Sequence, residues 1–575
     1  MIIVQDGDSL DLAVTALNNE PIIALDTETN ICDNMHERWV LGFSAYAPTV
    51  DESYYFPIRH IPFKDYTNVT KWSTLLKPQR IVYHNGKFDR QIFKKLEFNY
   101  DETPFEDTML MSYVINEEPP HGLKELADKY IGSDSSNDQK IVKGLTKGFG
   151  WESMPMPIMA QYATTDTILT YRLYLVLRDI LASTGEDQMQ LYLNDLEFSL
   201  ILQGIEEAGI MIDPVEARLK SAQCSELMLK IRNELGYDPA KPTQLGNRLY
   251  SPPPEGLGFR PISVGLTTKS FPNGRPKMGV AELEEHHHPE VGKVLEYRRV
   301  SKAKSSWYDA WPLLVDSNNR LHPSFHMHST VTARLSCSNP NMQQIPRDSE
   351  ENSTKSLFPV KKLIRCPKGY QVWEIDFSQQ ELRLASVYAD EDAMLDIFRN
   401  NGDPHQLLAD TLHVSRFIGK TCNFLLPYSG GIDELYMTVK KLAPSLGFTY
   451  KDAQKVYTDY HDKFPGFRRI AYECTATMDR VGYIKYWSKR RRHMTFNTHA
   501  AFNSLIQGGC ADITKESIKR VNQLNLSDTK IISIVHDSIW IETKNLDDIE
   551  LVKQAMTWDE KYFGVAFPVD AKRLA

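Results

Sequence analysis

Four acidic residues in the first third of the chain stand where their carboxylates could converge. Asp26 and Glu28 follow an apolar run in the segment ALDTETN, and residues i and i+2 of a strand point to the same face. Asp89 lies in YHNGKFD, and Tyr162 and Asp166 lie in YATTD. Because residues four apart on a helix share one face, we expect Tyr162 and Asp166 to lie together.

Taken alone, the D-x-E pair is more simply interpreted as a solvated acidic turn after a strand. Four carboxylates in one site favour another interpretation, because they would repel one another unless divalent cations neutralised them. Oxygen ligands of this kind suit Mg²⁺ or Mn²⁺. Two such ions about 3.5–4 Å apart stabilise the attacking and leaving oxygens in phosphoryl transfer. The acids therefore predict a two-metal site for phosphoryl transfer.

A second pair of aspartates lies in the last third of the chain. Asp376 ends the apolar run of VWEIDFSQQELRLA, and Asp537 interrupts the β-type run IISIVHDSIWIE. Taken alone, Asp376 is more simply interpreted as a helix cap, and Asp537 as a solvent-facing hairpin tip. Two aspartates at separate strand ends are also the minimum for two-metal nucleotidyl transfer, which is the interpretation we favour.

The segment RFIGKTCNFLLPYSGG lies between these aspartates and places Arg416, Lys420, Phe424 and Tyr428 four residues apart. On a helix this spacing forms one slowly rotating stripe. Cations in such a stripe would contact phosphate oxygens and aromatic rings would stack on a base and sugar, which predicts a nucleoside triphosphate site. The alternative is a solvated amphipathic face that ends at Pro427.

The elements that must position these residues can be outlined from the apolar pattern. Strand-type runs at 21–26 and 80–84, with helical stretches at 105–116 and 159–181, predict an α/β domain over 1–190. The pattern is then helical over 191–235 and again over 280–315. From 316 onward strands and helices alternate.

The segment 238–279 is rich in Pro and Gly, and we expect an exposed, mobile connection there. A plain loop tip is the simpler interpretation, and a partner-docking element is the alternative. The histidines at 286–288 are interpreted as a solvated turn rather than a metal site.

Composition excludes several classes of protein. The formal net charge is −9, and 42% of the residues are hydrophobic, which is typical of a globular chain. Residues 1–190 hold 17 basic and 28 acidic residues, so this part carries all of the net negative charge. The seven scattered cysteines argue against disulfide or zinc frameworks. With no signal peptide or membrane span recognisable, we expect a cytoplasmic protein.

The first constellation resembles the 3′–5′ exonuclease domain of the DnaQ-like (DEDD) family. The motifs D-x-E, N-x-x-x-D and Y-x-x-x-D occur in the same order as in the family. The tyrosine of the third motif is similar to the one that defines the DEDDy subgroup. HGLKELADKYIG at 121–132 is similar to a helix of these domains. The resemblance implies an RNase H-like α/β fold, metal binding by Asp26, Glu28, Asp89 and Asp166, and a water-orienting role for Tyr162.

The second constellation is similar to the polymerase of family A DNA polymerases. The matching motifs are DFSQQELR (376–383), R-x-x-x-K-x-x-x-F-x-x-x-Y (416–428) and HD (536–537). Supporting segments are TVTARLSCSNPNMQQIP, GDPHQLLAD and AFNSLIQGGCADITK. The resemblance implies an α+β right-hand polymerase over 191–575. Its thumb would lie mainly at 191–320, its palm at 321–400 and 500–575, and its fingers at 401–499.

Roles are carried over from the resemblance position by position. Asp376 and Asp537, helped by the Phe377 carbonyl, would bind two Mg²⁺ ions, with Mn²⁺ as a substitute. The triphosphate would be bound by Arg416, Lys420 and His405, the sugar and base would pack on Phe424 and Tyr428, and Glu381 would exclude ribonucleotides. Primer–template contacts are expected from Arg298, Lys302, Arg334, Asn503, Gln507 and His536.

The chain departs from the family pattern at four positions. Ala333, Leu425 and Ser429 stand where the family usually has glycine, and Ser538 stands where a glutamate usually follows the motif C aspartate. The last change removes a carboxylate, so we expect no metal role at 538.

Together these features predict a template-directed DNA polymerase with a proofreading 3′–5′ exonuclease, of a bacteriophage type that would act in the host cytoplasm. Its expected partners are primer–template DNA, dNTPs and a possible processivity factor, and we expect a monomer. The alternative is a 3′–5′ exonuclease fused to a non-polymerising nucleic-acid-binding module.

Overall fold

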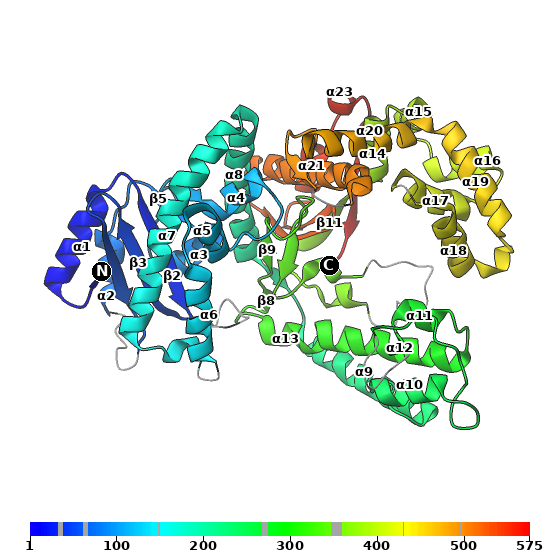
Figure 1. Ribbon diagram of the computed structural model, residues 1–575, viewed down its shortest axis with the longest axis horizontal. Coiled ribbons are helices and arrows are strands. Elements are labelled where there is room, and N and C mark those ends of the chain that lie inside the picture. The colour runs from blue at the N-terminus through cyan, green and yellow to red at the C-terminus, as the bar shows by residue number, and fades with distance from the viewer. Residues whose placement is uncertain are drawn as a thin grey trace. The chain divides into compact units, whose positions relative to one another are not determined.

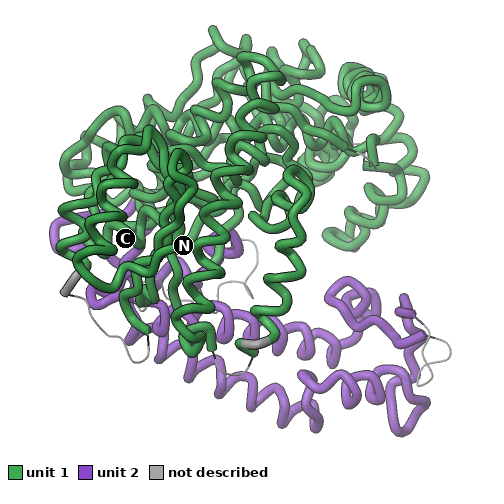
Figure 2. Tube along the Cα trace, turned by 60° about the vertical axis from the view of Figure 1, so that its left-hand side comes forward, with its two compact units in different colours: residues 1–208, 324–338, 373–573 green, residues 209–323, 339–372, 574–575 purple. Residues whose placement is uncertain are grey.

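The computed structural model describes all of the chain except residues 31, 33–37, 61–66, 148–149, 267–273, 347–358, 429 and 495–496. The elements are labelled in Figure 1. They form two compact units, which Figure 2 shows in green and purple. Unit 1 contains residues 1–208, 324–338 and 373–573, and unit 2 contains residues 209–323, 339–372 and 574–575.

The N-terminal part of unit 1 is built on a six-stranded sheet with strand order β1-β4-β3-β2-β5-β6. The central strand β2 pairs antiparallel with β3 and parallel with β5, so the sheet is mixed. The strands are β1 (Ile2–Ile3), β2 (Ile23–Thr29), β3 (Val40–Ala47), β4 (Glu52–Pro57), β5 (Ile81–Tyr83) and β6 (Phe105–Asp107).

Helices cover both faces of this sheet. They are α1 (Gly7–Asn19), α2 (Thr67–Leu75), α3 (Gly86–Lys95), α4 (Thr108–Ile115), α5 (Leu123–Ile131), α6 (Ser135–Thr146), the short η1 (Trp151–Ser153), α7 (Met156–Ser183) and α8 (Glu186–Ala208). Ile23 and Leu25 of β2 join the core that includes Leu10 and Leu17 of α1. Because side chains alternate along a strand, the even-numbered residues of β2 point to the other face.

The long helix α7 covers that other face. Figure 1 shows it lying across β2 and β3, against which it packs. Its buried Met159, Ala160 and Ala163 form a second core with Leu41 and Tyr55 of the sheet. The sequence-predicted helix at 159–181 is therefore present, and it lies over the strand that carries Asp26 and Glu28.

The helix expected over 105–116 begins later than predicted. Residues Phe105–Asp107 form β6, which pairs with β5, and α4 starts at Thr108. The Asp107 carboxylate caps α4 by accepting hydrogen bonds from the backbone of Met109 at 2.9 Å and Leu110 at 3.2 Å. β6 ends at Asp107, the residue that caps α4. An apolar pattern does not reveal a boundary that a polar capping residue sets.

The second part of unit 1 contains a four-stranded sheet in the order β14-β15-β11-β16. Its strands are β11 (Gln371–Phe377), β14 (Thr529–Val535), β15 (Ser538–Thr543) and β16 (Val569–Arg573). β11 and β16 are antiparallel, with Asp376 opposite Asp570. The accompanying elements are β9 (Ser324–His326), β10 (Ser336–Ser338), α14 (Gln380–Ala389), α21 (Ala501–Gln523), α22 (Asp547–Met556) and α23 (Glu560–Phe563).

Between β11 and α21 the chain is mostly helical. The elements are α15 (Asp392–Arg399), α16 (Pro404–Leu412), α17 (Arg416–Leu425), η5 (Leu426–Tyr428), α18 (Ile432–Leu442), η6 (Pro444–Leu446), α19 (Tyr450–Lys463), α20 (Pro465–Val481), β12 (Tyr483–Lys485), β13 (Arg491–His493) and η7 (Thr498–Ala500). α16 packs closely against α17, so two segments that contribute predicted triphosphate contacts are held together.

Buried ion pairs join the two parts of unit 1. The Arg490 guanidinium donates two hydrogen bonds of 2.9 Å to Asp195 of α8, and its Nε donates to Asp512 of α21 at 3.1 Å. Arg492 donates to Glu117 at 2.7 Å. The Arg490 and Arg492 side chains therefore pair with carboxylates inside the protein and do not face solvent.

Unit 2 is mainly helical. Its elements are β7 (Ile210–Met211), α9 (Pro214–Leu235), α10 (Pro242–Tyr250), α11 (Val280–Glu284), α12 (Pro289–Ala303), the π-helix η2 (Lys304–Asp309), α13 (Trp311–Leu314), β8 (Arg320–Leu321), η3 (Met342–Gln344) and η4 (Val360–Leu363).

The expectation of an exposed connection over 238–279 is wrong for part of that segment. Residues 242–250 form α10, and its Leu245 and Leu249 are fully buried in a core with Leu283 and Val294. Pro242 occupies the first turn of the helix, where a missing N–H has no cost. Proline therefore starts an element here instead of marking a loop. Residues 267–273 of the segment lie outside the described residues.

The histidines at 286–288 are not simply solvated. The His286 ring stacks on Phe259 with ring centroids 4.5 Å apart. His288 is the N-cap of α12, and its Nδ1 accepts a hydrogen bond from the Glu290 backbone at 3.2 Å.

Candidate functional sites

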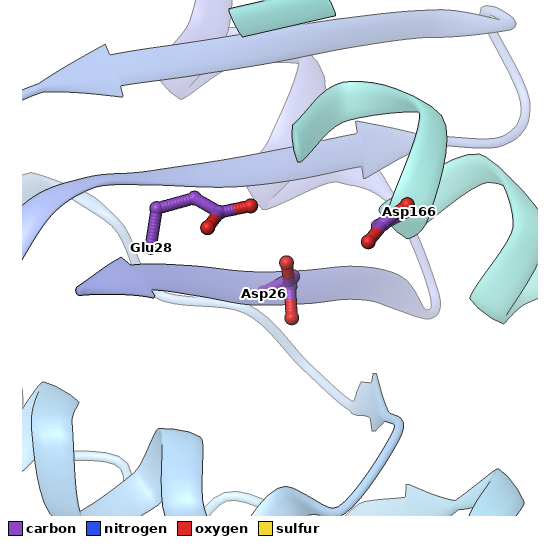
Figure 3. A group of neighbouring side chains, drawn as sticks. All are labelled: Asp26, Glu28 and Asp166. Atoms are coloured by element: carbon purple, nitrogen blue, oxygen red, sulfur yellow. The ribbon is translucent and has the colours of Figure 1, made fainter. Parts of the chain in front are cut away.

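Three of the predicted exonuclease carboxylates lie together. Asp26 and Glu28 project from β2, and Asp166 projects from α7. One carboxylate oxygen from each lies within 4.8 Å of the others. Figure 3 shows the three carboxylates turned toward one another. In the part of the chain that the structure describes, this is the only such group of three or more potential metal ligands.

Tyr162 lies one helical turn before Asp166 on α7, as the spacing predicts. Its ring meets the edge of the Trp151 indole, with centroids 5.2 Å apart. The Trp151 Nε1 donates a hydrogen bond to Glu28 at 3.0 Å. The indole therefore contacts both the tyrosine and a carboxylate of the group.

Asp89 lies beside this group rather than in it. It is 2% exposed on α3, and its Oδ1 accepts hydrogen bonds from the Thr27 backbone at 3.0 Å and the Thr27 hydroxyl at 2.6 Å. Thr27 stands between Asp26 and Glu28 in β2, so Asp89 fixes the strand segment that carries them.

The electrostatics of the group favour a bound cation. Burial raises the pKa of Asp26 to about 7, and burial together with Asp26 raises that of Glu28 to about 8. Burial, reinforced by Asp26, also raises the pKa of Asp89. Buried carboxylates with raised pKa values ionise fully only beside positive charge. An all-oxygen donor set of this kind fits a hard divalent cation.

A cavity of about 710 Å³ opens onto the group. Basic side chains share its lining with the acids; they are Arg38, Lys143 and Lys147. A cavity lined by both carboxylates and cations suits the end of a nucleic acid strand.

Sequence reasoning missed two residues of this site, Trp151 and Lys124. Lys124 forms an ion pair with Asp166, and its ammonium lies 4.7 Å from the centroid of the Tyr162 ring. Burial lowers its pKa to about 8. The signal was available in HGLKELADKYIG, where a lysine occupies the first turn of a helix.

The two predicted polymerase aspartates lie on one sheet. Asp376 is the penultimate residue of β11. Asp537 and His536 form the two-residue connection between β14 and β15, where Val535 pairs with Ser538. His536 has a φ of 54°, a conformation of hairpin turns. Since β15 neighbours β11, the sheet brings both aspartate-bearing segments to adjacent strands.

Glu374 is an acid near these aspartates that sequence reasoning missed. It shares a strand face with Asp376. Its Oε1 accepts hydrogen bonds from the Ser538 hydroxyl at 3.5 Å and the Trp540 indole at 3.2 Å. Ser538 stands where the family pattern led us to expect a glutamate. Glu374 of the neighbouring strand β11 places a carboxylate beside that position.

The predicted triphosphate stripe is only partly one helix. α17 carries Arg416, Lys420 and Phe424, all exposed, but it ends at Leu425 before Pro427. Tyr428 lies in the 3-10 turn η5, so it leaves the stripe.

His405 lies against this helix. It is buried, and its Nδ1 pairs with the Asn423 amide at 3.1 Å. Its ring centroid is 5.8 Å from that of Phe424. The exposed Arg416 pairs with Asp403 of the same segment at 2.8 Å.

Glu381 connects two other predicted residues, Tyr428 and Arg334. The Tyr428 hydroxyl donates to its Oε2 at 2.7 Å, and Arg334 forms an ion pair with its Oε1. Burial and Glu381 together raise the pKa of Tyr428, which therefore stays protonated and able to donate.

The remaining predicted DNA contacts are placed on helices and on the hairpin. The Gln507 amide donates to Asn503 of the same helix at 2.9 Å, and His536 is exposed. In unit 2, Lys302 is exposed on α12, while Arg298 donates to the Met278 carbonyl at 2.5 Å. Among the described residues, no helix is long and apolar enough to cross a membrane.

Family models match both parts of the chain. A model described as 3′–5′ exonuclease matches residues 1–182, and a model described as DNA polymerase family A matches residues 219–573. DNA polymerase I of Borreliella burgdorferi is 26% identical over 98% of the chain, and the Pseudomonas aeruginosa enzyme is 28% identical over 96%. The chain spans 62% of the length of each.

Two further similarities concern a phage protein and a solved structure. DNA polymerase DpoZ of Salmonella phage PMBT28 is 24% identical over 87% of the chain and 87% of its own length. The POL domain of Pol1 from M. smegmatis, in complex with DNA primer-template and dNTP, superposes with a TM-score of 0.77 at 19% identity. That structure covers 100% of the chain, so the predicted fold class is confirmed. Because the polymerase model matches more than half of its residues, the chain belongs to DNA polymerase family A.

Proposed function

We propose that this chain is a template-directed DNA polymerase that adds dNTPs to a primer 3′-hydroxyl and removes misincorporated nucleotides with a 3′–5′ exonuclease. The observation that carries the proposal is the family A match over residues 219–573, with Asp376 and Asp537 delivered to adjacent strands of one sheet. The exonuclease match over 1–182 and the carboxylate group within it support the second activity.

In the polymerase site, Asp376, Asp537 and the Phe377 carbonyl would hold two Mg²⁺ ions, for which Mn²⁺ can substitute. Metal bound there lowers the pKa of the primer 3′-hydroxyl and neutralises charge on the leaving pyrophosphate. Arg416, Lys420 and His405 bind the triphosphate.

Other residues of this site select and hold the substrates. Phe424 and Tyr428 pack on sugar and base, and Glu381, fixed by Tyr428 and Arg334, closes the space where a ribose 2′-hydroxyl would lie. The primer–template is held by Asn503, Gln507, His536, Arg298 and Lys302, together with Arg334.

In the exonuclease site, Asp26, Glu28, Asp89 and Asp166 would hold the metal ions, and Tyr162 orients the attacking water. The indole of Trp151 keeps Glu28 and Tyr162 in place. Bound metal supplies charge neutralisation for the scissile phosphate.

The chain would act as a monomer in the cytoplasm of a host cell, on phage or similar DNA, with a processivity factor as an optional partner. Similarity to the phage enzyme DpoZ over 87% of both chains supports this setting.

A primer-extension assay with Mg²⁺ tests the proposal. We expect templated dNTP incorporation by the wild-type chain, and none by Asp376→Asn or Asp537→Asn. Failure of the wild-type chain to incorporate dNTPs, with 3′ degradation intact, would instead favour an exonuclease fused to a non-polymerising nucleic-acid-binding module.

A double variant separates the two activities. Asp26→Ala combined with Glu28→Ala should abolish 3′ degradation and leave extension intact, because β2, which carries both residues, belongs to a different sheet from β11, which carries Asp376. Loss of both activities in this variant would contradict separate sites.

A further inference from the structure

Lys124 is buried among residues to which the exonuclease activity was assigned above. Its side chain is 5% exposed and forms an ion pair with the Asp166 carboxylate. The same ammonium lies 4.7 Å from the centroid of the Tyr162 ring. One cation therefore contacts both residues that α7 contributes to the site.

The position of Lys124 in its own helix is electrostatically unfavourable. α5 begins at Leu123 after the N-cap Gly122, so Lys124 stands in the first turn. The partial positive charge at a helix N-terminus repels a cation there. Burial of the ammonium adds a desolvation cost, which only nearby negative charge can offset. Asp26 and Glu28, together with the paired Asp166, supply that charge.

The ion pair also bears on metal binding. A carboxylate oxygen of Asp166 belongs to the group of three that lies within 4.8 Å. A divalent cation bound to the Asp166 carboxylate would lie close to the Lys124 ammonium, which pairs with the same carboxylate. Two positive charges so close together repel each other strongly.

On this basis, and resting on the proposed exonuclease function, we propose that Lys124 is a positioning residue of the exonuclease site. Its ammonium neutralises Asp166 in the metal-free protein, competes with the divalent cation for that carboxylate, and holds the Tyr162 ring in the orientation that hydrolysis needs.

The proposal predicts opposite effects on binding and on hydrolysis when the charge is removed. Lys124→Met retains much of the side-chain length but lacks the ammonium, so the carboxylates should bind a divalent cation more tightly. At saturating metal the same variant should hydrolyse more slowly, because the Tyr162 ring has lost the cation that orients it. A residue that merely supported the fold would weaken both properties together.

The binding experiment uses the full chain with Asp376→Asn and Asp537→Asn, which leaves the exonuclease site as the proposed Mn²⁺ site. Mn²⁺ affinity is measured by electron paramagnetic resonance with and without Lys124→Met. We expect affinity to rise by at least about threefold. Unchanged or weaker Mn²⁺ binding would overturn the proposal.

The hydrolysis experiment measures release of 3′ nucleotides from single-stranded DNA at saturating Mn²⁺, in the chain with intact polymerase aspartates. Lys124→Met should lower the rate by about 10- to 100-fold, and Lys124→Arg, which keeps the charge, should recover at least part of it. A rate equal to that of wild type in Lys124→Met would also overturn the proposal.

Lys129 offers a matched control on the same helix. It is exposed, and its ammonium lies 4.7 Å from the Tyr130 ring centroid, the same distance as in the Lys124–Tyr162 pair. Lys129→Met should change neither Mn²⁺ affinity nor hydrolysis. Primer extension by Lys124→Met at the wild-type rate shows that this variant folds.

Failure of the proposal and failure of the proposed function are distinguishable. A wild-type chain that releases no 3′ nucleotides would refute the exonuclease function itself. A wild-type chain that does so, with a Lys124→Met variant that loses Mn²⁺ affinity, refutes only the role of Lys124.

Discussion

The hydroxyl of Tyr428 donates a hydrogen bond of 2.7 Å to the carboxylate of Glu381, which lies 47 residues earlier in the chain. The bond joins the turn after α17 to the first turn of α14. Because Arg334 pairs with the other oxygen, both oxygens of Glu381 are engaged in the absence of substrate. A residue proposed to exclude ribonucleotides is thus held rigidly before any nucleotide arrives.

Removing that hydroxyl should relax sugar selection. Tyr428→Phe frees one oxygen of Glu381, and we expect kcat/KM for ribonucleotide incorporation to rise about tenfold relative to dNTP incorporation. Single-nucleotide extension kinetics measure the ratio. Tyr450→Phe is the control, because its exposed hydroxyl donates to Asp433 at a similar 2.8 Å. An unchanged ratio in Tyr428→Phe would show that Arg334 alone positions Glu381.

Arg490 should be important for stability. Its side chain is 5% exposed and pairs with Asp195 and Asp512, so Arg490→Met removes the guanidinium from two buried carboxylates and leaves only Lys515, at 3.9 Å, beside Asp195. We expect the free energy of unfolding to fall by about 3–5 kcal/mol, measured by urea denaturation with tryptophan fluorescence. Lys455→Met, which removes an exposed ion pair with Asp459, should cost under about 0.5 kcal/mol. A comparable loss in both variants would contradict this reasoning.

Histidines should make the protein sensitive to acid. Burial lowers the pKa of His84 to about 3 and the pKa values of His326 and His328 to about 4, with Lys124 facing His84 and Lys87 facing the other two. Each folded-state pKa lies below the unfolded value of about 6.5. The unfolded chain therefore binds more protons between these values.

Stability from these histidines is fully present above about pH 6.5 and should be lost as pH falls toward 4. Urea unfolding at a series of pH values measures the slope. His328→Asn should flatten it, whereas His413→Asn, at an exposed position with a φ of 53° that Asn tolerates, should not. A slope in His328→Asn equal to that of the wild-type chain would refute the expectation.

Replacing Ser538 by glutamate should be harmful. Ser538 is buried and donates to Glu374, so Ser538→Glu places two carboxylates against each other. We expect a loss of about 1–3 kcal/mol in stability and slower primer extension. Combining it with Glu374→Ala should recover much of both, as coupled neighbours do. Additive losses in the double variant would show that the two positions do not interact.

Much of the site could be predicted because short-range periodicity determines it. The two-residue period of a strand places Asp26 and Glu28 on one face, and the four-residue spacing on α7 places Tyr162 beside Asp166. The motif matches predicted the family correctly.

What could not be predicted depends on contacts between distant segments. Asp89 contacts the backbone of Thr27, and Lys124 pairs with a residue 42 positions away. The helix α10 formed in a proline-rich segment because two leucines found a core there. None of these partners is visible in local spacing.

The pairing of β11 with β16 has a consequence for the order in which the sites can form during translation. The exonuclease sheet is complete once β6 has been made, at residue 107. The strand that carries Asp376 gains its neighbour β16 only when residues 569–573 leave the ribosome. A growing chain can therefore complete its exonuclease sheet several hundred residues before its polymerase sheet.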